Sequence, residues 1–471
     1  MSSSASNITS GFIDLATFDE LEKYMYGGGS ATAYFVRETR KSTWFTQVPV
    51  LLSQKNGTGE FGSDLSVNIS RAGDYLLQAW LRVSFPAVTL TSTNTYGYDG
   101  SIRWTRNLMH NLLSECSISF NDLVAARFDN YHLDFWAAFT VPAGKLNGYR
   151  NMIGDYDELT GPHPFVSNGD ATYTATSIPA VTLNLPLPLF FSRDSGVALP
   201  TAALPYNEMR INYSFRNATD LLILDNLGAA AHVNPSHAVA ATDLNGGALP
   251  VLQQVQTWAN YAIVSNDERK RMACAPRNIL IEQVQSAPLN TVTPTTNSSP
   301  SFDLRFSHAI KVIFFAIRNT TVASQWSNYT AASPVPMTKV VDWTPSLAVD
   351  PIDKTTLTYE STARLYNMGS DYFSLIQPYY SAPVIPNETG YHMYSYSLDF
   401  ICLDPKGSTN YGKLTNVSIM PTLTADCVTA AGGSGAVNSG ADFAQTYRMV
   451  VTVVNNNIIR VSGGALGFPV L

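Results

Sequence analysis

Hydrophobic and polar residues alternate one by one along much of the chain, which is the period of a β-strand with one buried face. In LLQAWLRVSF, every second residue from Leu77 to Phe85 is apolar and is predicted to face a core. Similar runs recur between turns rich in Gly, Pro and Asn, at DLSVNIS, ECSISF, EMRINYSF, ILIEQVQ, TLTYE, TNVSIM and RMVVTVV. The pattern predicts an all-β chain built as sandwiches or barrels.

Three segments depart from this alternation and are predicted to be helical. SGFIDLATFDELEKYMY can be capped by Ser10 and gathers its apolar residues near one face, so it predicts a short amphipathic helix. DNYHLDFWAAF predicts a helical insertion. SNDERKRMA predicts a solvated linker helix, because Ser265 or Asn266 can cap a first turn that carries two acidic residues.

An internal repeat indicates that the β-unit occurs twice. Ser70 to Ala72 in NISRAGDYLLQAWLRV matches Ser307 to Ala309 in RFSHAIKVIFFAIRN. Further on, Ala126 to Phe128 matches Ala363 to Leu365. The separation of the two matches is the same in both copies, because 127 minus 70 and 364 minus 307 both equal 57. We therefore expect two copies of a roughly 200-residue β-unit, with the break near residues 265–278.

Length and charge narrow the classes of function. The 471 residues are enough for two large all-β domains or three smaller ones. Charged residues make up 14% of the chain, against about 25% in typical soluble domains, so much of the surface is polar but uncharged or is covered by partners. The formal net charge of -7 gives no electrostatic reason to bind nucleic acid or anionic lipid.

Cysteine usage and the N-terminal sequence point to synthesis in the cytosol. The N-terminus has neither a signal-peptide pattern nor a myristoylation site, and the longest apolar run, AIKVIFFAI, is too short to span a bilayer. The cysteines are far apart and form no CxxC pair. We expect four reduced, mostly buried thiols at Cys116, Cys274, Cys402 and Cys427.

One triplet, Asp194 to Gly196, resembles the nucleophile turn of a trypsin-like protease. Arg193 and Val197 stand where that turn needs glycines to build an oxyanion hole, and neither His110 nor His132 lies in a general-base context. At the comparable place in the second copy, DFICLDPKGSTNYGKLTNVSI contains no such triplet. The triplet is interpreted as a turn whose glycine tolerates a positive φ, and no enzyme activity is predicted.

No metal or cofactor is predicted either. His232 and His237 come nearest to a ligand pair, but their spacing does not suit one strand, and no glycine motif for nucleotide binding opens a helix. Ten Asn-x-Ser/Thr sequons occur and are expected to stay unmodified in a chain without a secretory signal.

Several longer segments carry a resemblance to a known family. They are GFIDLATFDELEKYMYGG, AGDYLLQAWL, SIRWTRNLMHN, PLFFSRDSGVALPTAALPYNEMRI, NDERKRM followed by ILIEQVQ, GSTNYGKLTN and NNNIIRVSGGALGFPVL. Together they resemble the iridovirus major capsid proteins, within the double jelly-roll capsid family of large DNA viruses. The resemblance implies an N-terminal segment (1–30), two consecutive eight-stranded antiparallel jelly rolls (31–264 and 279–471) and a linker helix between them (265–278).

The resemblance also implies a function and partners. It implies a homotrimer that forms pseudo-hexameric capsomers, because three copies of a two-barrel chain present six similar sectors that tile an icosahedral virion shell. Neighbouring capsomers, minor capsid proteins and penton proteins are the implied partners, with an internal membrane nearby but contacted only indirectly, and no nucleic acid. Synthesis and assembly are expected in the host cytoplasm. The alternative function is a carbohydrate-binding, lectin-like jelly-roll module on a surface.

The N-terminal segment is the candidate contact with minor capsid proteins. The family implies that Gly11 to Tyr26 lies at the base of the capsomer. An alternative is that this segment only packs beneath the first barrel. The candidate contact residues are Phe12, Ile13, Leu15, Phe18 and Leu21.

Overall fold

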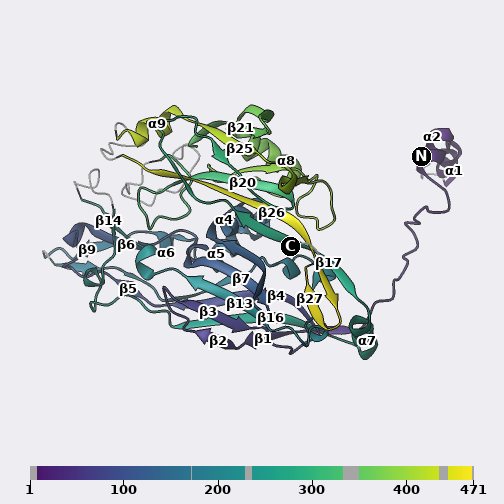
Figure 1. The fold of residues 1–471 in the computed structure, drawn as a ribbon, viewed down its shortest axis with the longest axis horizontal. Helices are drawn as coiled ribbons and strands as arrows, with labels where there is room; N and C mark the ends of the chain where they lie inside the picture. Colours follow the sequence, from purple (N-terminus) through teal and green to yellow (C-terminus); the bar gives the residue numbers. More distant parts are fainter. Residues whose placement is uncertain (1–7, 171, 229–235, 333–349, 434–443, 469–471) are drawn as a thin grey trace, which may run out of the picture. The chain divides into compact units, whose positions relative to one another are not determined.

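The computed structural model describes residues 8–170, 172–228, 236–332, 350–433 and 444–468. Residues 1–44 and 45–471 form two separate units. The first unit holds two short helices, α1 (Ile8–Ala16) and α2 (Glu20–Met25). The second unit is mostly β and contains short helices between its strands (Figure 1). The all-β prediction is therefore confirmed for this unit.

The single N-terminal helix expected from the sequence is instead two helices. Ser10, the expected cap, lies inside α1, and the helix ends before Thr17, whose hydroxyl donates to the Asp14 carbonyl. Asp19 then caps α2 in a reciprocal capping box with Glu22. Such a box satisfies backbone N–H groups that only a helix start leaves free, so it favours a new helix at this point.

Strands β1 to β16 form the first half of the larger unit. One sheet has the order β1-β16-β4-β12 and another has β2-β3-β13-β7-β8, all antiparallel. Their bounds are β1 (Phe45–Leu52), β2 (Gln54–Gly57), β3 (Asp64–Asn68), β4 (Tyr75–Phe85), β7 (Leu113–Phe120), β8 (Leu123–Asp129), β12 (Val181–Pro186), β13 (Met209–Phe215) and β16 (Gln254–Val264). Smaller sheets contain β5 (Val88–Thr89), β6 (Gly100–Trp104), β9 (His163–Ser167), β10 (Tyr173–Ala175), β11 (Ser177–Ile178), β14 (Leu222–Asn226) and β15 (Ser236–Ala238).

Strands β17 to β27 form the second half. The sheet orders are β17-β26-β20-β23 and β19-β25-β21-β22, with β18, β24 and β27 added to the first sheet. Their bounds are β17 (Arg277–Ser286), β18 (Asn290–Val292), β19 (Phe302–Asp303), β20 (Ala309–Asn319), β21 (Ile352–Tyr359), β22 (Thr362–Gly369), β23 (His392–Ser395), β24 (Thr409–Asn410), β25 (Val417–Leu423), β26 (Tyr447–Ser462) and β27 (Ala465–Gly467).

The two halves repeat one strand order, as the internal repeat in the sequence predicts. The first matched segment precedes β4 in the first half and runs into β20 in the second, and both strands hold the third place in their sheets. The second matched segment lies in β8 and in β22, which both lie at the edge of the other sheet. Helix α7 (Asn266–Cys274), the expected linker helix, lies in the chain between β16 and β17.

Alternation predicts the buried face of β4 correctly over most of its length. Ala79, Leu81, Val83 and Phe85 are buried, but Leu77 is only half-buried and Leu76 is fully buried in its place. The cause is a β-bulge, because Gln78 pairs with Asn260 and Leu76 pairs with the next residue of β16, which leaves Leu77 as an extra residue. One extra residue reverses the inward and outward positions beyond it.

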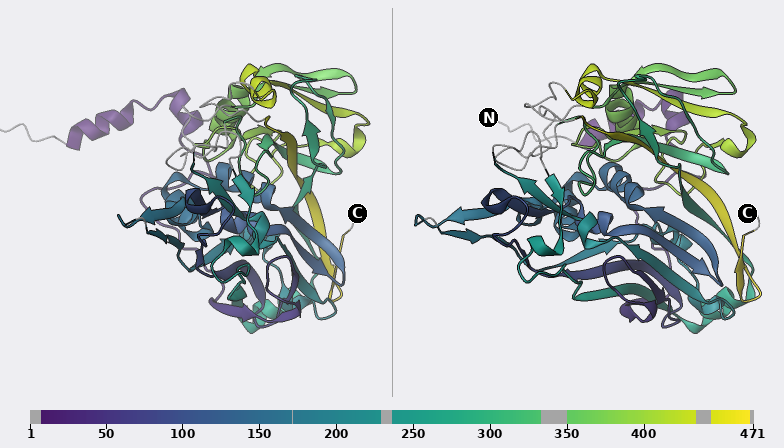
Figure 2. Two further views of the ribbon diagram at one scale, coloured as in Figure 1. Left: turned by 90° about the vertical axis from the view of Figure 1, so that its left-hand side faces the viewer. Right: turned by 60° about the vertical axis from the view of Figure 1, so that its left-hand side comes forward.

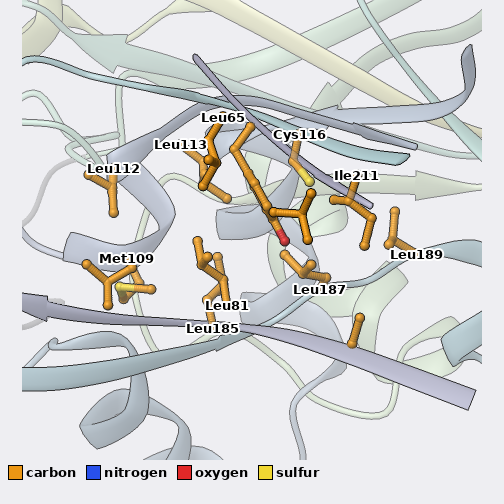
Figure 3. Close-up of a cluster of buried hydrophobic side chains, with 14 of the residues drawn as sticks. Leu65, Leu81, Met109, Leu112, Leu113, Cys116, Leu185, Leu187, Leu189 and Ile211 are labelled. Carbon is orange, nitrogen blue, oxygen red and sulfur yellow. The ribbon is translucent and has the colours of Figure 1, made fainter. Parts of the chain in front are cut away.

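The core of the first half lies between its two large sheets (Figure 3). Leu65, Cys116 and Ile211 come from one sheet, while Leu81 and Leu185 come from the other, and each is at most 1% exposed. Burying a leucine side chain contributes about 1.5–3 kcal/mol. Burial also raises the pKa of the Cys116 thiol, which keeps it protonated.

The two halves share part of one hydrophobic core. The 16-residue strand β26 runs from the second half along the first (Figures 1 and 2). Near its end, Ile459 and Val461 belong to the same core as the first-half residues, as do Ile279 and Ile281 of β17. The remaining helices are α3 (Leu108–Leu112), α4 (Asn130–Thr140), α5 (Ala143–Ile153), α6 (Asp157–Thr160), α8 (Gln377–Ser381) and α9 (Ala425–Ala431).

Candidate functional site

The five predicted contact residues lie on the N-terminal unit. Phe12, Ile13 and Leu15 belong to α1, Phe18 lies between the helices and Leu21 belongs to α2. All five side chains are exposed, from 49% for Phe18 to 74% for Leu15. Exposed apolar side chains at this density on two short helices offer a surface that a partner can cover.

A second site, which sequence reasoning missed, is the interface between the two halves of the larger unit. Helix α4 lies between them (Figure 1), and it is the helical insertion expected at DNYHLDFWAAF. The rings of Phe135 and Phe139 stack on Phe314 of β20 at centroid distances of 5.7 and 5.4 Å. Tyr391 meets both α4 rings edge-on. The sequence shows the apolar residues of this helix but not the strand against which they pack.

A buried carboxylate joins the halves at the same helix. Asp134 accepts hydrogen bonds from His110 Nδ1 at 2.8 Å on the first-half side. On the second-half side it accepts from Ser327 Oγ at 2.7 Å and from the Tyr329 hydroxyl at 2.8 Å. Burial and the charge of Asp134 raise the pKa of Tyr329 well above its ordinary value, so the phenol remains a donor.

A cluster of two arginines and two carboxylates lies beside this helix. Arg106 pairs with Asp155 and also with Glu388 of the second half, at 3.4 and 2.5 Å, and Arg150 reaches Glu388 at 3.2 Å. Burial alone would lower the pKa of Arg106, but the charges of Glu388 and Asp155 outweigh it and raise that pKa. Arg106 therefore stays protonated, and against the opposing effect of burial its charge lowers the pKa of Asp155. Arg150, Asp155 and Glu388 line a small cleft of about 60 Å³.

The region of Asp194 to Gly196 forms another contact between the two halves of the larger unit. Arg193 places its guanidinium carbon 3.7 Å from the centre of the Trp136 ring and reaches Glu282 of β17 at 2.6 Å. The other oxygen of Glu282 accepts from the fully buried Lys311 at 2.5 Å. The Gly196 carbonyl accepts a hydrogen bond from Arg277 at 2.8 Å. The triplet thus belongs to a turn that joins the first half to the second.

The polar side chains considered for a catalytic triad take part in structural contacts instead. Ser195 lies in a 3₁₀ turn, and its hydroxyl is 3.5 Å from the carboxylate of Asp194. His110 bonds Asp134 and Tyr149, while burial and the charge of Arg193 lower the pKa of His132 to about 3. One expectation was wrong: Gly196 does not adopt a positive φ. A side chain there would instead approach Asp194, at 3.3 Å from the built Cβ.

The cysteines and histidines of the described residues form no further candidate site. The four cysteines are free, with Cys116 and Cys427 buried, Cys402 half-buried and Cys274 exposed. His232 lies outside the described residues, and only the backbone of His237 is described. In the part of the chain that the structure covers, no cluster of three or more His, Cys, Asp or Glu side chains has metal-site geometry. Among the same residues, no helix is long and apolar enough to cross a membrane.

Solved structures show the same fold. The chain of a PBCV-1 virus capsid quasi-atomic model matches with a TM-score of 0.68 at 19% identity, covering 93% of this chain and all of that one. The Faustovirus major capsid protein matches with a TM-score of 0.66 at 11% identity, over 94% of both chains.

Sequence relatives extend over the full length. The family described as "Major capsid protein N-terminus" matches residues 33–264, and "Large eukaryotic DNA virus major capsid protein" matches residues 268–467. The major capsid protein of Costelytra zealandica iridescent virus is 63% identical over 100% of both chains, and that of Rana tigrina ranavirus is 46% identical over 99% of both. The chain therefore belongs to the major capsid protein family of the iridoviruses.

Proposed function

We propose that this capsid protein assembles as a homotrimer whose capsomer has pseudo-six-fold symmetry, and that each half of the chain is an eight-stranded jelly roll. The four core strands of each sheet support this assignment, because both halves repeat the same order and every pairing between core strands is antiparallel. We assign the first barrel to residues 31–264, the linker helix to 265–278 and the second barrel to 279–471, after an N-terminal segment at 1–30.

The observation that carries the trimer is the buried interface between two halves of equal strand order. A trimer of such chains presents six similar sectors only if the two halves of each chain keep one orientation relative to each other. Asp134, the pairs around Glu388 and the contact from Arg193 to Glu282 all cross this interface inside the fold. Hydrogen-bonded buried polar groups tolerate little displacement, so they favour a single orientation.

Contacts between copies have candidate surfaces on the outside of the larger unit. The edge strand β1 exposes Phe45, Val48 and Leu51, and its outer edge has no strand partner in the described residues. Pro49 in this strand removes one backbone donor, which limits uncontrolled strand addition at the edge. We propose side-chain packing between neighbouring copies over such surfaces, in keeping with the low charge of the chain.

We further propose that the N-terminal segment contacts minor capsid proteins through Phe12, Ile13, Leu15, Phe18 and Leu21. The exposure of these apolar side chains supports the proposal. Penton proteins and the internal membrane would then be neighbours of the shell rather than ligands of this chain. Four free thiols fit synthesis and assembly in the reducing host cytoplasm.

Light scattering after size-exclusion chromatography tests the trimer and the segment together. The full-length protein is expected at three times 51.3 kDa, about 154 kDa. Deletion of Ser2 to Gly29 is expected to leave the β content unchanged but to impair trimer or shell assembly. A monomer or dimer that binds glycans on an array would refute the shell protein and support a lectin. Unimpaired particle formation by the truncated chain would refute the role of the segment.

A further inference from the structure

A polar cleft of about 810 Å³ lies between the two halves, and its lining includes no residue of α4 or of the Asp194 to Gly196 turn. Three arginines line it: Arg216 follows β13 of the first half, whereas Arg318 and Arg448 lie on β20 and β26 of the second half. Hydroxyl groups complete much of the wall, at Ser114, Ser214, Thr291, Thr320 and Thr446. Asp220 is the one carboxylate among the described lining residues, and it is exposed.

An indole ring holds two of these arginines in place. The guanidinium carbons of Arg216 and Arg318 each lie 3.7 Å from the centre of the Trp326 ring, so the ring is covered on both faces. The Trp326 N–H donates to the Asp220 carbonyl at 2.8 Å, which fixes the ring plane. Cation–π contacts orient the guanidinium groups but leave their positive charge uncompensated.

The described residues compensate these positive charges only weakly. Arg216 donates to the Asn130 side-chain oxygen and Arg318 donates to the Tyr131 hydroxyl, both at 2.9 Å, and these acceptors are neutral. None of Arg216, Arg318 and Arg448 forms an ion pair with another described residue. Burial lowers the pKa of Arg216 and the charge of Arg318 lowers it further, while Tyr131, Asp129 and Asp220 oppose this only in part.

Two further observations point to a missing anion. Arg318 and Arg448 are directly opposite each other on paired strands, an arrangement of like charges that destabilises a sheet. In addition, Arg318 Nε and Arg216 Nη1 are buried and donate no hydrogen bond to any described residue, and Arg318 as a whole is only 5% exposed. An unused donor on a buried charged group is costly, so an acceptor that reaches either atom would stabilise the pair of arginines.

We propose that this cleft binds a tetrahedral oxyanion, the phosphate or sulfate group of a small ligand, between Arg216, Arg318 and Arg448. Guanidinium groups suit such anions because they present several N–H donors in one plane. Ligands that bind by ring stacking do not fit, since both faces of Trp326 are already covered. A bound oxyanion contacts arginines from both halves and therefore stabilises their docked orientation.

The matched variants are Arg448→Gln and Arg460→Gln. Both arginines lie on β26 and are exposed, but only Arg448 lines the cleft. Because Arg448 is exposed, its replacement should leave the fold intact. Arg216→Gln is a second test from the other half.

Isothermal titration calorimetry of the purified full-length protein tests the site with pyrophosphate, inorganic phosphate and inorganic sulfate at constant ionic strength. We expect one binding site per chain, a roughly ten- to hundredfold weaker affinity in Arg448→Gln and Arg216→Gln, and unchanged affinity in Arg460→Gln. Binding of phosphate, sulfate or both supports the site and identifies the group that it takes. Absence of binding by all three anions in the millimolar range, or equal affinity in Arg448→Gln and wild type, would overturn the proposal.

Discussion

Removing the charge of Glu282 should destabilise the larger unit strongly. Its carboxylate is 3% exposed and is shared by Lys311, which is fully buried, and Arg193, which is 14% exposed. In Glu282→Gln both cations lose their counter-charge, and among the described residues Lys311 keeps only the Cys402 carbonyl as an acceptor, at 2.7 Å. Breaking a buried ion pair from one side costs about 3–5 kcal/mol, because the partner charge remains buried.

This free energy converts into a measurable shift of the melting temperature. An unfolding entropy of about 2.1 cal/mol/K per residue over ~400 residues amounts to about 0.8 kcal/mol/K. A loss of about 3–5 kcal/mol then lowers Tm by about 4–6 °C. Differential scanning calorimetry at one fixed scan rate and protein concentration measures the shift.

Two further variants separate charge burial from general damage. Glu115→Gln removes an exposed carboxylate of β7 and should change stability by less than about 0.5 kcal/mol. The double variant Glu282→Gln with Lys311→Met removes the buried ammonium as well, so it should melt above the Glu282→Gln single variant. Equal Tm values for Glu282→Gln and Glu115→Gln, or a double variant that melts below the single one, would refute the reasoning.

Two more predictions concern a close backbone approach and acid sensitivity. A Cβ at Gly390, where φ is +100°, would lie 2.1 Å from the Tyr329 carbonyl oxygen, whereas Gly246 has φ +94° and open space. Gly390→Ala should therefore lower Tm clearly more than Gly246→Ala in the same calorimetric assay, and equal shifts would contradict the steric argument. His132 has a folded pKa of about 3, lowered by burial and by the charge of Arg193, so the unfolded chain binds its proton first, near pH 6.5. Its contribution is fully present above that pH and is lost as pH falls towards 3, at up to ~1.4 kcal/mol per pH unit. Denaturant unfolding of His132→Gln from pH 7 to 4 should show a flatter decline than wild type, and parallel curves would count against it.

The strands follow from local physics, and the sequence predicts them well. Alternation identifies β3, β4, β7, β13, β17, β21 and β25, because burial of one face imposes a period of two on any half-buried strand. The segment RMVVTVV is also a strand, in β26, but residues 449–455 are all buried there, so its apolar run reflects burial of both faces. Alternation misplaces Leu77 because a bulge depends on pairing with β16, and the nearest paired residues, Gln78 and Asn260, are 182 residues apart in the chain. The repeat succeeds because two copies of one strand order keep the same short turn signals.

The interface could not be derived in the same way. Arg193 in LFFSRDSG gives no local sign that its partner is Glu282, and the sequence offers no means of bringing Arg216 and Arg318 onto one indole ring. These contacts depend on how one β-unit docks on the other, which is a long-range property. The helix break after Ala16 is different, since Asp19 and Glu22 form a capping box that is readable in the sequence.

Single-particle electron microscopy of the purified full-length protein tests the central claim most directly. If the buried interface holds the two halves of each chain in one orientation, three-fold averaged particles will contain six barrel-shaped densities spaced about 60° apart. Particles with three isolated lobes, or variable angles between the two densities of one chain, would contradict the account.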